Sequence, residues 1–100
     1  MTTTAEIVTF RLLPGSDPHA FAKAAADMEP FLQETGGMIS RHLSVDDDGL
    51  WTDHILWTSL EAAKKAAAQI MQHPAAEPFV KMIDGPSANM RHATVHMQKG

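Results

Sequence analysis

Two histidines, His42 and His54, are the residues of this sequence best suited to chemistry, and they stand on either side of a predicted hairpin turn. The turn is the acidic run DDDG at residues 46–49, and an Asp-Gly pair strongly favours a tight connection between antiparallel strands. With a three-residue loop, His42 pairs directly with His54, and directly opposed side chains have Cβ atoms about 5 Å apart. Two imidazoles at that distance could share a substrate, a water molecule or a metal ion. Alternatively, they hydrogen-bond to each other in a buried interface, and a register slipped by one residue would set His42 opposite Asp53.

Arg11, on the first predicted strand, is expected to join this polar group. An arginine flanked by histidines can hold a carboxylate or an enolate-like oxygen, while His42 or His54 acts as general base. The simpler alternative is that Arg11 pairs with an acid of its own chain or of a partner chain. Further polar residues are expected on the same face of the sheet as candidates for ligand binding, namely Thr9, Ser40, Thr52, His92 and Thr94.

Other titratable residues favour structural roles. The chain has no cysteine and no His-x-x-x-His or His-x-Asp spacing, so we expect no metal ion and no tightly bound cofactor. Asp53 and Arg41 are expected on the helix-facing side of the sheet as an ion pair, because a buried carboxylate needs a partner. His73 is expected to cap the C-terminal end of a helix.

The elements that must position these residues follow the order βαββαβ. Apolar alternation predicts strands over residues 5–13, 38–45, 50–57 and 88–97. The first helix begins at Ser16 or Asp17 and ends at residues 36–37, with a kink or a split at Pro30. The second begins at Thr58 or Ser59 and breaks at residues 73–74, and a short helix follows over 75–83. Right-handed crossovers then give a ferredoxin-like α+β domain, an antiparallel sheet of order 4-1-3-2 with both helices on one face.

The two faces of this sheet are expected to differ. The apolar residues predicted to face the helices are Val8, Phe10, Leu12, Ile39, Leu43, Val45, Trp51, Ile55, Trp57, Ala93, Val95 and Met97. The opposite face mixes the polar residues named above with Ile7, Met38, Leu56 and Met90. A second copy packed on this mixed face would bury its apolar members and enclose the polar ones, so we expect a homodimer that closes a β-barrel.

Composition limits the classes of partner. One hundred residues with 44% hydrophobic content predict a single domain over residues 1–100. The net charge of −4 and the scattered basic residues argue against nucleic acid. No apolar run is long enough to span a membrane, and the N-terminus lacks the features of a secretory signal. The expected location is therefore the cytoplasm.

The segment WTSLEAA at residues 57–63, followed by His73 and by EPF at 77–79, resembles the signature region of the dimeric α+β barrel superfamily. This superfamily includes antibiotic biosynthesis monooxygenase-like and stress-response proteins. Length and element order agree over nearly the whole chain. The resemblance implies the fold and a homodimer. It leaves the chemistry open, because members range from cofactor-free oxygenases and haem degraders to proteins without known activity.

Two departures exclude one branch of this group. Haem-degrading members carry an asparagine on the first strand and a haem-ligating histidine in the short helix. This sequence has no asparagine on its first strand and Ile83 at the ligand position. Three hypotheses remain: a cofactor-independent, monooxygenase-like enzyme acting on an aromatic or polyketide-like substrate, a non-catalytic ligand-binding or stress-response barrel, and a purely structural dimer.

Overall fold

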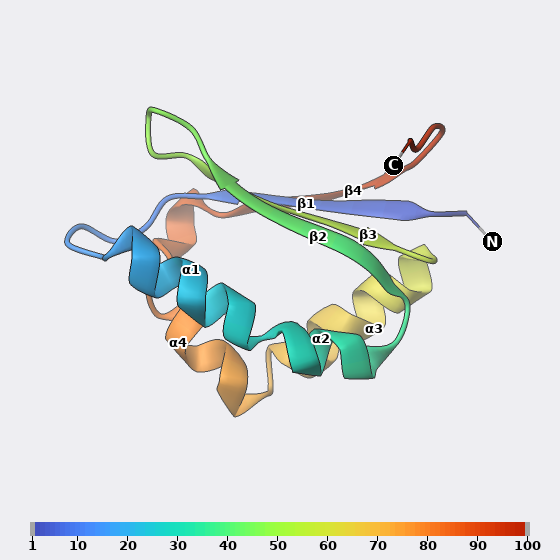
Figure 1. Ribbon diagram of the computed structural model, residues 1–100, viewed down its shortest axis with the longest axis horizontal. Coiled ribbons are helices and arrows are strands. Elements are labelled where there is room, and N and C mark those ends of the chain that lie inside the picture. Colours follow the sequence, from blue (N-terminus) through green and yellow to red (C-terminus); the bar gives the residue numbers. More distant parts are fainter. Residues whose placement is uncertain (1, 100) are drawn as a thin grey trace.

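Four antiparallel strands form one sheet, and the helices lie against a single face of it (Figure 1). The structure is a computed structural model that describes residues 2–99. The strands are β1 (Thr4–Phe10), β2 (Met38–Val45), β3 (Trp51–Trp57) and β4 (Asn89–Thr94). Their order across the sheet is β2-β3-β1-β4, which confirms the predicted ferredoxin-like α+β arrangement. The face away from the helices is called the outer face below.

The first helical segment is split in two, as the position of Pro30 predicts. Helix α1 (Pro18–Asp27) begins at Asp17, whose side chain accepts a hydrogen bond from the backbone N–H of His19. Helix α2 (Glu29–Thr35) follows after Met28 alone. Proline lacks the N–H that would continue the helical ladder, and its ring blocks the carbonyl one turn earlier, so the axis changes direction there.

Helix α3 (Leu60–Ile70) begins at the second of the two predicted caps, because Ser59 accepts from the N–H of Ala62. The predicted helix over 75–83 is shorter than expected. It consists of a 3₁₀ turn (Pro74–Ala76) and α4 (Glu77–Val80), and a second 3₁₀ turn (Gly85–Ser87) leads into β4. His73 caps the turn that follows it, through Nδ1 and the N–H of Ala75 at 3.0 Å, and not the end of α3.

The hairpin between β2 and β3 has the predicted register. His42 pairs with His54, and the slipped pairing of His42 with Asp53 does not occur. The turn is held by Asp46, whose Oδ1 accepts from the N–H groups of Asp48 and Leu50 at 2.9 Å each. An aspartate that satisfies the turn amides fixes the loop length, and the loop length fixes the register.

Two predictions about the faces are wrong. A register shift between Met38 and Ser40 adds one residue to β2, so Met38 packs against the core and Ile39 is exposed, the reverse of the expectation. In β4, Met90 pairs with Val8 and His92 with Glu6, on the side of the sheet that faces the helices.

The β4 error has a simple geometric cause. Apolar alternation favoured Ala93, Val95 and Met97 as helix-facing residues, but the 3₁₀ turn before the strand sets the opposite phase. A shift of one residue moves every side chain of a strand to the other face. Thr94, like His92, therefore belongs to the helix-facing row, and Met97 lies beyond the strand and is exposed.

An aromatic cluster fills the space between the sheet and the helices α1 and α4. The rings of Phe10, Phe21 and Phe79 lie within 6.2 Å of one another, and Trp51 contacts Phe21 edge-on at 4.9 Å. Such contacts stabilise a core beyond simple area burial. No helix within residues 2–99 is long and apolar enough to cross a membrane.

Candidate functional site

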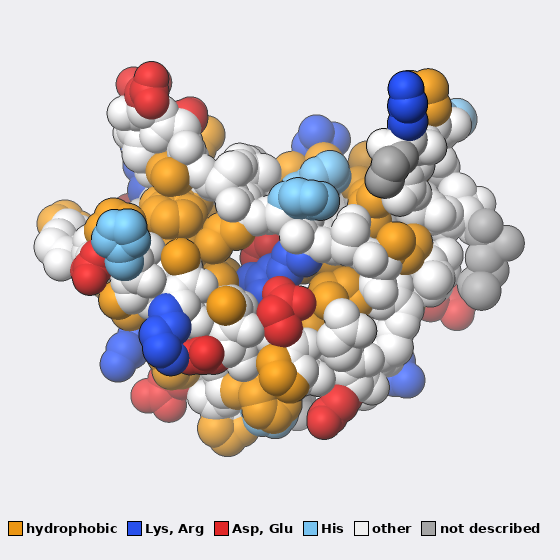
Figure 2. Space-filling view, in the orientation of Figure 1, with side chains coloured by type: hydrophobic (Ala, Val, Ile, Leu, Met, Phe, Trp, Pro, Cys, Tyr) orange, Lys and Arg blue, Asp and Glu red, His pale blue; other side chains and the backbone are white. Residues whose placement is uncertain are grey.

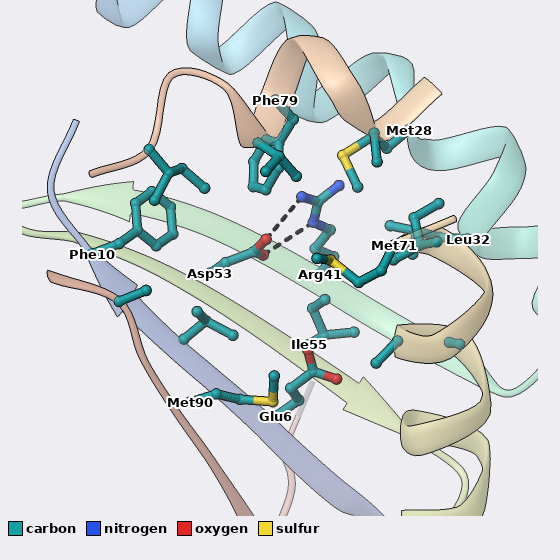
Figure 3. A pocket seen from close by; sticks show the side chains of 18 of the residues that line it. Glu6, Phe10, Met28, Leu32, Arg41, Asp53, Ile55, Met71, Phe79 and Met90 are labelled. Carbon is teal, nitrogen blue, oxygen red and sulfur yellow. Dashed lines mark hydrogen bonds and ion pairs between the residues drawn. The ribbon is translucent and has the colours of Figure 1, made fainter. Parts of the chain in front are cut away.

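A cavity of about 370 Å³ lies between the helix-facing side of the sheet and the helices (Figure 3). Its floor is formed by β1 and β3, including Val8 and Ile55, and its walls carry Met28, Leu32 and Phe79 from the helices. This volume falls within the range of small-molecule sites, which are mostly apolar with a few polar groups that orient the ligand. The cavity is therefore the leading candidate for a binding site.

One side of the cavity reaches the protein surface. Three of its lining residues, Met71 at the end of α3, Val80 in α4 and Met90 in β4, are exposed large hydrophobic side chains. We call these three residues the mouth. The space-filling view looks onto the β2 edge of the sheet, opposite the β4 edge that carries Met90. On this side it shows a second hollow between the sheet and the helices, in which a basic group lies beside an acidic one (Figure 2).

An ion pair between Arg41 of β2 and Asp53 of β3 lies on the cavity wall. Arg41 Nε and Nη2 donate to the two carboxylate oxygens of Asp53 at 3.0 and 2.8 Å, a bidentate arrangement drawn in Figure 3. Both side chains are buried, with 6% and 8% of their surfaces exposed. The structure confirms the predicted pairing of these two residues.

Arg41 also holds the junction between α1 and α2. Its Nη1 donates to the backbone oxygen of Ala25 at 2.8 Å and to Glu29 Oε1 at 3.1 Å. Burial alone would lower the pKa of Arg41, but the hydrogen bonds and negative charges of Asp53 and Glu29 outweigh it and raise the pKa. These bonds use four of the five N–H groups of the guanidinium. Arg41 is therefore a structural cation with little capacity left to bind an anionic ligand.

Glu6 of β1 is the second carboxyl group of the cavity. Its Oε1 accepts a hydrogen bond from Trp57 Nε1 at 3.1 Å, and within residues 2–99 no hydrogen bond reaches Oε2. Burial raises the pKa of Glu6 above its ordinary value of 4.5, and the charge of Asp53 adds to this effect. The bond from Trp57 and the charge of Arg41 oppose it. A carboxyl group in this setting is a stronger base than one in water.

Beside Glu6 stands His92, its direct partner on β4. His92 Nε2 lies 4.0 Å from Glu6 Oε1, and it is buried without a hydrogen-bond partner among the described residues. The remainder of the imidazole is partly exposed at the edge of the sheet. The sequence predicted His92 as a ligand-binding residue on the same face as His42 and His54, but the phase of β4 places it on the helix-facing side.

Five of the predicted site residues are on the outer face of the sheet. His42 and His54 are paired there, and Thr9 is paired with Thr52 in the next row. Ser40, opposite Leu56, completes this group. The roles predicted for these residues in catalysis or ligand binding stay predictions.

Two predicted site residues stand apart from the histidine pair. Arg11 is exposed at the end of β1, where Nη1 donates to the backbone oxygen of Asp48 in the hairpin turn at 2.7 Å. Thr94 lies in the helix-facing row of β4, opposite Thr4. The structure thus brings His42 and His54 together but does not place Arg11 between histidines.

The sequence analysis does not identify Glu6 as a site residue and does not predict the cavity, although the strand pattern contains a signal for the position of Glu6. Glu6 is two residues before Val8 and four before Phe10, so strand alternation alone places it on the helix-facing side. Within residues 2–99 no three His, Cys, Asp or Glu side chains gather in a way that could hold a metal ion.

Several solved structures share this architecture. No known family model matches the sequence, and no curated protein matches it. A mutant form of SnoaB, a cofactor-independent oxygenase from Streptomyces nogalater, superposes with a TM-score of 0.78 over 98% of this chain and 97% of its own, at 17% identity. A proposed antibiotic biosynthesis monooxygenase from Bordetella bronchiseptica superposes with a TM-score of 0.79 over 97% of this chain and 100% of its own, at 13% identity.

The same fold also occurs without an assigned activity. A protein of unknown function from Nitrosomonas europaea gives a TM-score of 0.72 at 17% identity, over 99% of this chain and 94% of its own. At these identities the likeness establishes architecture and not chemistry. The resemblance indicated by the segment at 57–63 is confirmed at the level of the fold. The chain has the ferredoxin-like α+β fold of a cofactor-independent oxygenase and of two proteins proposed to be antibiotic biosynthesis monooxygenases.

Proposed function

We propose that the cavity binds an aromatic or polyketide-like small molecule and that the protein oxygenates it without a cofactor. The observation that carries this proposal is the position of Glu6 on the floor of an apolar cavity of about 370 Å³. One oxygen of its carboxyl group accepts no hydrogen bond from the described part of the chain. The structural likeness to a cofactor-independent oxygenase supports the proposal.

The charges around the cavity favour an uncharged substrate. Arg41 is neutralised by Asp53 and Glu29, so it offers no free cation to a carboxylate or phosphate ligand. Glu6 adds further negative charge whenever it ionises. Placing an anion in this apolar space would leave its charge without a partner, which is costly. A neutral phenol or ketone with an extended apolar ring system fits the lining better.

Oxygenation without a cofactor places a chemical requirement on the substrate. The electrons that reduce O₂ must come from the substrate itself, so a C–H bond next to a carbonyl or aromatic ring is first deprotonated. The carbanion reacts with O₂ to a peroxide, which takes back the proton and loses water to leave a ketone. One CH₂ group and one O₂ molecule thus give one C=O group and one H₂O molecule. In this scheme Glu6 is the base that removes the proton.

Outside this site, we infer that a second copy of the chain covers the outer face. Partly exposed Ile7 and Leu56 lie there beside the histidine pair, and no helix within residues 2–99 covers them. Light scattering at micromolar concentration should give twice the mass of the chain. Leu56→Lys should reduce this mass to that of a monomer, and a monomeric wild-type protein would contradict the dimer.

Oxygen uptake measures the proposed activity. The probe is a hydroxylated anthrone, a neutral tricyclic ketone with an acidic CH₂ group, and an oxygen electrode is read together with quinone absorbance. Wild-type protein should consume one O₂ per quinone formed, and Glu6→Gln should lower kcat about 10²-fold or more. The matched control is His19→Gln on the exposed surface of α1, which should leave kcat unchanged.

Two other results would favour the alternatives. The pairing of His42 with His54 supports an outer-face site, and loss of activity in His42→Gln or His54→Gln but not in Glu6→Gln would favour it. If the probe quenches the fluorescence of Trp57 saturably but is never oxidised, the protein is a non-catalytic binder.

A further inference from the structure

The carboxyl group of Glu6 and the imidazole of His92 lie side by side at the edge of the cavity. Their strands pair them directly, and Glu6 Oε1 lies 4.0 Å from His92 Nε2. The nitrogen is buried and has no hydrogen-bond partner in the described chain, which is rare for a buried polar atom. The side chain of Glu6 is 11% exposed and that of His92 is 25% exposed. His92 therefore connects a buried carboxyl group with the solvent at the edge strand β4.

We propose that His92 takes the substrate proton on from Glu6 and returns it, so that the two residues act as one proton-transfer unit. This inference rests on the function proposed above, because it concerns the fate of the proton that Glu6 removes. Its residues come from two different strands, and within the described residues no group hydrogen-bonds to the buried nitrogen.

The transfer is balanced as follows. The substrate C–H bond breaks, its electron pair stays on carbon, and the proton moves to a carboxylate oxygen of Glu6. The Glu6 O–H bond then breaks as Nε2 of neutral His92 gains the proton, which leaves a carboxylate beside an imidazolium. After O₂ has added to the carbanion, the proton travels back through Glu6 to the peroxide anion. No proton is gained or lost over the cycle, and O₂ is the oxidant.

Electrostatics gives a reason for the second residue. Burial raises the pKa of Glu6, so this carboxyl group holds a proton more tightly than a carboxyl group in water does. Asp53 adds to this effect, while Arg41 and Trp57 oppose it. An imidazolium at close range would favour the ionised carboxylate again. The gap of 4.0 Å must close to about 3 Å for transfer, as catalytic hydrogen bonds often do when substrate binds.

The kinetic test is His92→Ala with and without added imidazole. We expect kcat for the anthrone probe to fall about 10²-fold with little change in KM, and imidazole to restore at least a tenth of the activity. His19→Ala is the control and should match wild type. A His92→Ala enzyme within twofold of wild type, or one that imidazole does not rescue, would overturn the proposal.

A second measurement is independent of turnover. The carboxyl resonance of Glu6 is titrated by NMR in wild type and in His92→Gln, which keeps a similar size without a proton site. If the two residues exchange a proton, the pKa of Glu6 should rise by about one unit in the variant. An unchanged titration would refute the pair even if the probe is not a substrate. A wild-type protein that shows the pair by NMR but no oxygen uptake would refute only the proposed function.

Discussion

Replacing Arg41 by methionine should cost about 3–5 kcal/mol of the free energy of unfolding. The substitution keeps an unbranched apolar stem but leaves the carboxylate of Asp53 buried and unpaired, together with the backbone oxygen of Ala25. Breaking a buried ion pair by removing one partner typically has this cost. For a domain of this size, 1 kcal/mol corresponds to roughly 4–8 °C in Tm, so Tm should fall by at least about 12 °C.

Urea unfolding followed by the fluorescence of the buried Trp51 and Trp57 measures this change. Arg41→Lys keeps the charge but loses the bidentate geometry, so its free energy of unfolding should lie between those of wild type and Arg41→Met. The matched control is Lys23→Met, because Lys23 pairs with Asp27 on the surface with 77% and 61% of the two side chains exposed. Exposed ion pairs contribute little to stability, so we expect Lys23→Met to change the free energy of unfolding by about 0.5 kcal/mol or less.

The double variant Arg41→Met/Asp53→Leu separates pairing from packing. Replacing a whole buried pair by apolar residues is often nearly neutral, so the double variant should recover most of the lost stability. If Arg41→Met costs less than about 1 kcal/mol, or if the two single losses simply add, the carboxylate of Asp53 does not depend on Arg41 and the reasoning is wrong.

Three further predictions concern stability. The raised pKa of Glu6 means that the unfolded chain ionises first as pH rises above 4.5. Between pH 4.5 and the higher pKa that Glu6 has in the native state, the free energy of unfolding of the wild type therefore falls as the pH rises. Glu6→Gln should lack this fall and so gain stability relative to wild type in urea unfolding across that pH range. Parallel pH profiles of the two proteins would contradict this prediction. Gly37→Ala should destabilise the protein by about 1–3 kcal/mol more than Gly15→Ala in thermal unfolding. Both glycines have a positive φ (87° and 86°), but only at Gly37 would an added Cβ meet side chains within 3 Å. Equal losses of stability would refute the close contact. Ser59→Ala should cost about 1 kcal/mol by loss of the α3 cap, and Thr58→Ala, which removes no cap bond, should cost less.

Local signals in the sequence were sufficient for the element order and the hairpin. The run at 46–49 determined the register because one aspartate satisfies the turn amides, and Pro30 determined the split of the first helix. The bulge at Met38 could not be foreseen, because it depends on how β2 meets its neighbour and not on its own alternation.

The candidate site was harder to predict than the fold. The polar residues of the sequence cluster on the predicted outer face of the sheet, whereas Glu6 lies among apolar residues on the helix-facing side. A single charged residue in an apolar strand face gives no signal of a binding site. The phase of β4 decided the position of His92, and that phase is set by a 3₁₀ turn whose geometry the sequence of the strand does not encode.

The two ends of the cavity differ in stiffness, with a consequence for ligand selectivity. At the inner end, Arg41 joins two strands to the junction of two helices through four hydrogen bonds, so that end has little freedom to adapt. The mouth carries Met71 and Met90, whose flexible thioether side chains can rearrange around differently shaped groups. If the cavity binds the ligand proposed above, changes to the part of that ligand that lies near Arg41 should weaken binding strongly. Changes to the part that lies at the mouth should be tolerated.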